Sequence, residues 1–108
     1  MIIISVDNDA ARLKRFGLLL QRTFPGCTLV EFTDPMLSAK YIVNHDVDVV
    51  FAEISMRPAD GLMLQNVLRT NKPDARVILM QDTPDGSSYG TVKRPQTAKQ
   101  LVACVWGQ

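Results

Sequence analysis

Acidic, amide and basic side chains follow the short apolar segments of this sequence, and side chains of these types bind cations or pair with one another. The residues in question are Asp7, Asn8, Asp9, Glu53, Gln81, Asp82, Lys93 and Arg94. Carboxylate oxygens are the ligands that hard divalent cations prefer. Carboxylates and an arginine guanidinium also neutralise each other through charge-assisted hydrogen bonds. The residue types therefore leave two interpretations open, a divalent-cation site and a self-neutralising ion-pair cluster.

The elements that must position these side chains alternate along the chain. Apolar, β-branched segments predict strands at 1–6, 27–32, 47–54, 76–80 and 89–94. Apolar residues at helical spacing predict helices at 10–24, after Asp34-Pro35, at 62–70 and at 98–106. Uniformly apolar strands are typical of parallel sheets that are buried on both faces. The alternation predicts an α/β fold with a doubly wound, five-stranded parallel sheet.

The carboxyl ends of the strands in such a sheet lie together and form its sites. Asp7, Asp82 and Arg94 come at or just after the ends of predicted strands, and Glu53 lies at the end of another. We therefore expect three carboxylates and a basic residue to converge on one pocket. Asp9 has a second interpretation, because an aspartate before a helical segment is a common helix N-cap.

Four segments resemble the receiver domain of bacterial two-component response regulators, the CheY-like family. They are VDND at Val6–Asp9, DVVFAEISMRPADGLML at Asp48–Leu64, RVILM at Arg76–Met80 and KRP at Lys93–Pro95. The resemblance covers nearly the whole chain, and the segment at Asp48–Leu64 is the most specific. It implies a flavodoxin-like fold and a regulatory module of two-component signalling that is not an enzyme.

The chain departs from the family where the family carries its chemistry. Glu53 stands at the phosphoacceptor aspartate, Asn8 at an acidic metal ligand, Gln81 at the Ser/Thr switch and Arg94 at the lysine, with Lys93 as an alternative after a one-residue slip. Asp7 is kept, and Asp9 matches a further acid. The resemblance thus implies at most a weak metal site at Asp7 and Asp9. The extra methylene carries the Glu53 carboxylate further into the pocket, where we expect it to pair with Arg94.

The connection before the last predicted strand is short. Eight residues, 81–88, separate the fourth and fifth predicted strands, whereas a parallel crossover through a helix needs about a dozen residues or more. We expect the family's fourth helix to be shortened or missing, or the fifth strand to pair differently. An apolar sheet face near these strands would then be under-covered, which favours a homodimer or a partner element over it.

Composition narrows the class of protein further. The 108 residues carry a net charge of +1, so we expect one domain over 1–108, with neither nucleic acid nor membrane as a partner. No Gly-rich phosphate loop is present. Cys27 and Cys104 lack metal-ligand spacing, and with no signal segment we expect a cytoplasmic location. His45 is expected at the surface, and Trp106 in the core or at an interface.

Together these features predict a phosphorylation-independent pseudo-receiver that acts through a protein partner or an effector domain. No cofactor is expected. The alternative is a functional receiver that binds Mg²⁺ and accepts phosphate from a histidine kinase. A third possibility, other enzyme chemistry on the same fold, lacks a nucleophile–base pair in this sequence.

Overall fold

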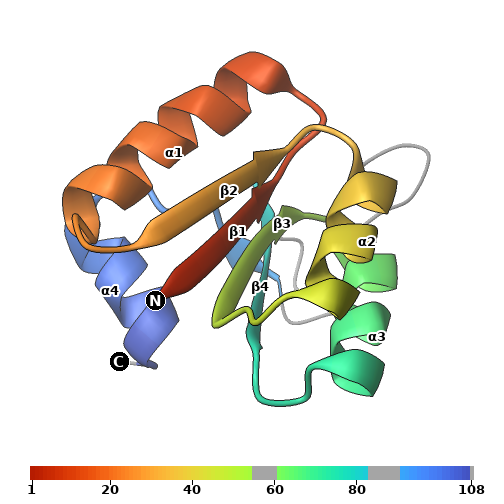
Figure 1. Ribbon diagram of the computed structural model, residues 1–108. Helices are drawn as coiled ribbons and strands as arrows, with labels where there is room; N and C mark the ends of the chain where they lie inside the picture. Colours follow the sequence, from red (N-terminus) through yellow and green to blue (C-terminus); the bar gives the residue numbers. More distant parts are fainter. Residues whose placement is uncertain (55–60, 83–90, 108) are drawn as a thin grey trace.

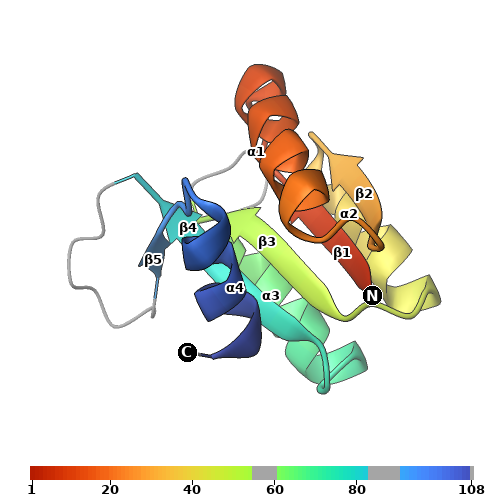
Figure 2. The same cartoon turned by 90° about the vertical axis from the view of Figure 1, so that its left-hand side faces the viewer.

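The computed structural model describes residues 1–54, 61–82 and 91–107. Its strands form one parallel sheet in the order β2-β1-β3-β4-β5 (Figure 1; β5 is labelled in Figure 2). The strands are β1 (Ile2–Val6), β2 (Thr28–Phe32), β3 (Val49–Glu53), β4 (Arg76–Gln81) and β5 (Val92–Lys93). The helices are α1 (Ala10–Thr23), α2 (Pro35–Asn44), α3 (Gly61–Asn71) and α4 (Ala98–Trp106). The predicted doubly wound α/β fold is confirmed.

The sheet is covered on both faces, with α1 and α4 on one side and α2 and α3 on the other (Figure 2). Phe51 of β3 is fully buried on the first side and meets Phe16 of α1 edge to face, with ring centroids 5.2 Å apart. Its neighbours Val50 and Ala52 point to the other side, against Leu64 of α3. This is the alternation of a strand that is buried on both faces.

Capping side chains start three of the helices where the sequence placed them. Asp9 caps α1, Asp34 caps α2 with Pro35 in its first turn, and Thr97 caps α4. Each side chain accepts a hydrogen bond from a backbone N–H that the first helical turn leaves unpaired. Gly107 ends α4 in the left-handed conformation, with a φ of 74°.

The fifth strand is shorter than predicted. Val92 and Lys93 pair in parallel with β4, which excludes a different pairing for this strand. The connection at 83–90 lies outside the described residues, so the shortening or loss of a fourth helix stays a prediction. The predicted motifs at Met56–Pro58 and Asp60 also lie outside them.

The expected under-covered sheet face is not found in the part of the chain that the structure describes. The β4 side chains of Ile78, Leu79 and Met80 are at most 6% exposed. Ile78 and Met80 pack in the cluster that includes Leu101 of α4, and Leu79 packs with α3 on the other face. The predicted bare sheet face, and a dimer that would cover it, are therefore wrong for these residues, because α3 and α4 already cover them. Among the described residues, no helix has the length and apolar character needed to span a membrane.

Candidate functional site

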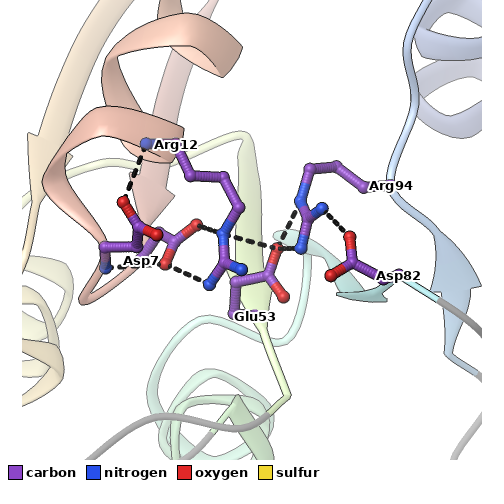
Figure 3. Close-up of polar contacts among 6 residues, drawn as sticks. Asp7, Arg12, Glu53, Asp82 and Arg94 are labelled. Atoms are coloured by element: carbon purple, nitrogen blue, oxygen red, sulfur yellow. Dashed lines mark hydrogen bonds and ion pairs between the residues drawn. The ribbon is translucent and has the colours of Figure 1, made fainter.

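Five charged side chains meet at the carboxyl end of the sheet (Figure 3). They are Asp7 after β1, Arg12 in the first turn of α1, Glu53 at the end of β3, Asp82 after β4 and Arg94 after β5. Asp7 and Glu53 are each only 4% exposed, whereas Asp82 lies at the surface. The predicted convergence of three carboxylates and Arg94 is present, and it includes a second arginine.

Arg12 binds the Asp7 carboxylate in a bidentate contact. Its Nε lies 2.5 Å from Asp7 Oδ2, and its Nη2 donates to Asp7 Oδ1 at 2.7 Å. Oδ1 also accepts from the backbone N–H of Asp9 at 2.9 Å. The hydrogen bonds that Arg12 donates to Asp7 raise the pKa of its guanidinium further above the ordinary value, although burial opposes this effect. Both oxygens of the Asp7 carboxylate are thus engaged by this chain's own donors.

Arg94 joins the other two carboxylates. Its Nε donates to Glu53 Oε1 at 2.6 Å, and its Nη2 lies in ion-pair contact with the same oxygen. Its Nη1 donates to Asp82 Oδ1. Nη2 is buried and has no hydrogen-bond acceptor among the described residues. The contact between Glu53 and Arg94 that the sequence led us to expect is present.

Glu53 lies between the two guanidinium groups. Its Oε1 is bound by Arg94 and lies 3.9 Å from Arg12 Nε. Burial raises the pKa of the Glu53 carboxyl group, and the hydrogen bond from Arg94 only partly offsets this. At the surface, the same arginine lowers the pKa of Asp82 by its hydrogen bond. For Arg94 itself burial lowers the pKa, but the bonds to Asp82 and Glu53 outweigh it, so the pKa is raised.

The other predicted site residues lie outside this cluster. Asn8 and Lys93 are exposed, so the side chain that reaches Glu53 is that of Arg94 and not of its neighbour. Asp9 is exposed and accepts a hydrogen bond from the backbone N–H of Arg12 at 3.0 Å. This hydrogen bond is the main cause of the lowered pKa of Asp9. Asp9 therefore serves as a helix cap here. Gln81 is partly buried and pairs in register with Lys93.

The described residues do not fit a Mg²⁺ ion. Mg²⁺ needs free carboxylate oxygens in near-octahedral geometry, but both oxygens of Asp7 are bound by Arg12, and Glu53 Oε1 is bound by Arg94. No group of three His, Cys, Asp or Glu side chains within residues 1–54, 61–82 and 91–107 has the arrangement of a metal site. Of the two interpretations that the sequence left open, the geometry is that of the self-neutralising cluster.

Arg12 was not among the site residues that the sequence predicted. It lies five residues after Asp7, in the first turn of the helix that Asp9 caps. An arginine at that position is usually a solvated residue of the polar helix face. The available signal was its distance along the chain, since one helical turn brings its long side chain back over the acidic loop that precedes the helix.

Comparisons with known proteins agree with the fold. No protein-family model matches the sequence, and no curated protein is similar to it in sequence. The chain is similar in structure to a response regulator protein from Burkholderia pseudomallei with a phosphorylated aspartic acid, calcium ion and citrate. The TM-score is 0.82 at 14% identity, over 96% of this chain and 65% of that one.

Two isolated receiver domains are similar over more of their length. The beryllofluoride-activated NtrC4 receiver domain dimer matches with a TM-score of 0.82 at 15% identity, over 98% of this chain and 93% of that one. A CheY-like receiver domain protein from Methanospirillum hungatei matches with 0.79 at 15% identity, over 98% and 90%. The doubly wound fold is thus of the flavodoxin-like class. Within that class, it is the fold of response regulator receiver domains.

Proposed function

We propose that this protein is a receiver-like regulatory module that works without phosphorylation and acts through protein–protein contacts. The observation that carries the proposal is the guanidinium of Arg12, which binds Asp7 and lies 3.9 Å from Glu53. Arg12 thus supplies, among these carboxylates, the positive charge that a bound cation would otherwise supply. The two buried carboxylates, Asp7 and Glu53, are thus matched by two guanidinium groups without an added ion.

The same contacts oppose phosphoryl transfer to Glu53. Such a transfer depends on positioning the acceptor oxygen and on neutralising the charge that develops on the phosphoryl oxygens. Glu53 Oε1 is bound by Arg94, and Asp7 has no free oxygen for a metal ion. The contacts that would have to break are partly buried and charge-assisted, which makes them stronger than neutral hydrogen bonds.

Incubation with acetyl phosphate and Mg²⁺ is expected to leave the mass of the wild-type protein unchanged, because Arg12 binds both oxygens of Asp7 and Arg94 binds Oε1 of Glu53. Intact-mass spectrometry of the folded protein makes this measurement. The matched comparison is the Arg12→Ala, Glu53→Asp double variant, which frees Asp7 and returns an aspartate to the acceptor position. An adduct only on this variant would attribute the loss of reactivity to these two residues. An adduct on the wild-type protein would establish a working receiver instead.

We also propose that the protein acts in the cytoplasm as a homodimer through α4. Val102 and Trp106 on this helix are 38% and 61% exposed, and large exposed apolar side chains grouped on one element favour an interface. The similarity to the NtrC4 receiver domain, which is a dimer, supports self-association. Sedimentation equilibrium is expected to show a dimer that Trp106→Ser weakens. A monomer at high protein concentration would contradict this assembly.

A further inference from the structure

A groove of about 620 Å³ runs along α1, on the side that faces the segment after β5. Its α1 wall includes Arg15, Leu19 and Arg22, and Pro95 and Gln96 line it from the other side. Figure 2 shows α1 and α4, the helix that this segment leads into, on the same face of the sheet. The groove is therefore elongated in the direction of a helix, and its wall combines charged and apolar side chains.

The charge of this groove is not apparent from the net charge of the chain. Helix α1 contains two further basic residues, Arg12 and Lys14, besides Arg15 and Arg22, and no acidic residue. Arg12 is neutralised within the ion-pair cluster. Arg15 and Arg22, in contrast, form neither a hydrogen bond nor an ion pair with any residue that the structure describes. Their two guanidinium groups are the positive charges of the groove that no described residue pairs with.

The spacing of the α1 wall is regular. Arg15, Leu19 and Arg22 lie at i, i+4 and i+7, which puts them in one row on the helix surface. At 1.5 Å per residue, the Cα atoms of the two arginines are about 10 Å apart along the axis. Leu19 lies between them and is only partly buried. Along the helix axis, the row presents a positive charge, then an apolar side chain, then a second positive charge.

We infer that this groove binds an acidic amphipathic helix of a partner protein. Two carboxylates spaced at i and i+7 on that helix would pair with Arg15 and Arg22, and an apolar side chain between them would cover Leu19. The inference rests on the proposed function as an interaction module and adds the chemistry of the partner. Paired guanidinium and carboxylate groups on either side of an apolar contact give both affinity and register.

The lining of the groove favours a protein helix over nucleic acid. Asp9 and Asp82 also line it, and their carboxylates would repel a phosphate backbone that followed the groove. Phe16 is the aromatic residue of the lining, but it is 6% exposed. Single-stranded nucleic acid is usually held by bases stacked on exposed aromatic rings. A partner helix avoids Asp9 by placing a basic or neutral residue opposite it.

The probe is a lactam-stapled helical peptide with two glutamates seven residues apart and a leucine four residues after the first. Titrated to about 1 mM into ¹⁵N-labelled protein, it is expected to shift the amide signals of Arg15, Leu19 and Arg22, and to bind more weakly as salt rises. The Arg15→Gln, Arg22→Gln double variant is expected to bind about tenfold more weakly, because two interfacial ion pairs are lost. The matched Lys14→Gln, Lys40→Gln variant removes two exposed charges outside the groove and should bind within about twofold of wild type.

Three outcomes would overturn the inference. They are no amide shifts at the highest peptide concentration, equal binding of a peptide with lysine in place of both glutamates, and equal losses in the two double variants. Tighter binding of a single-stranded oligonucleotide at the same residues would replace the protein partner with nucleic acid. None of these outcomes bears on phosphorylation, so the inference and the proposed pseudo-receiver function fail separately.

Discussion

The Arg12→Ala variant is expected to bind Mg²⁺, whereas the wild-type protein is not. Removal of the guanidinium leaves the Asp7 carboxylate, 4% exposed, with the backbone N–H of Asp9 as its remaining donor among the contacts described. Glu53 loses its second positive neighbour at the same time. Two buried carboxylates near one another attract a cation, and Mg²⁺ commonly binds through one or two carboxylates with water completing its shell.

The same variant is expected to lose about 3 kcal/mol of unfolding free energy without Mg²⁺, since one partner of a buried ion pair has been removed. Mg²⁺ at ten times its dissociation constant should return about 1.4 kcal/mol. Urea unfolding with Mg²⁺ and with EDTA measures both quantities, and Lys14→Ala is the matched control on the exposed face of α1. A variant as stable as wild type, or one that Mg²⁺ leaves unchanged, would show that Arg12 does not stand in for a cation.

The Arg94→Met variant is expected to be destabilised by about 3 kcal/mol at neutral pH, because an ionised Glu53 is left buried without its closest partner. Methionine keeps the apolar length of the side chain. Burial already raises the pKa of Glu53, and loss of the hydrogen bond from Arg94 raises it further. An acid with a raised pKa in the folded state loses its contribution to stability as the pH rises. The destabilisation should therefore grow as the pH rises above 4.5, the ordinary pKa of this carboxyl group.

The control for this prediction is the Glu53→Gln, Arg94→Met double variant. Glutamine does not ionise, so the double variant should regain most of the lost stability at neutral pH and lose the pH dependence above 4.5. Urea unfolding of the four proteins in this cycle across the pH range supplies the coupling free energy. A cost of Arg94→Met that is independent of pH would mean that the ionisation of Glu53 is not what Arg94 stabilises.

The order and type of the elements were predictable because local patterns determine them. Continuous apolar, β-branched segments gave β1 and β3, and the caps at Asp9, Asp34 and Thr97 placed the starts of three helices. Helix α4 has the predicted bounds. The extent of β5 was not predictable, because an edge strand ends where the one strand beside it no longer has backbone groups to pair with. Among the described residues of this edge, that neighbour pairs with Val92 and Lys93.

The candidate site was predictable only in part. The positions of Glu53, Asp82 and Arg94 follow from the topology, because parallel strands bring their carboxyl ends to one edge of the sheet. The spacing of Arg12 from Asp7 permits their contact but does not determine it. Its side chain turns back onto Asp7 instead of extending into water, and that choice depends on the buried carboxylates nearby. The roles assigned to these residues, and a single domain over 1–108, remain predictions.

The shortness of strand β5 affects where the molecule unfolds locally. In the described part of the chain, the backbone of this strand reaches the sheet through β4 alone, and the N–H of Arg94 adds one bond to Gln81. Edge segments with few backbone hydrogen bonds unfold locally at a lower free energy than central strands. Amide hydrogens of β5 should therefore exchange with solvent sooner than those of β3. The Arg94 side chain, bonded to Glu53 and Asp82, is then expected to hold this edge of the molecule against local opening.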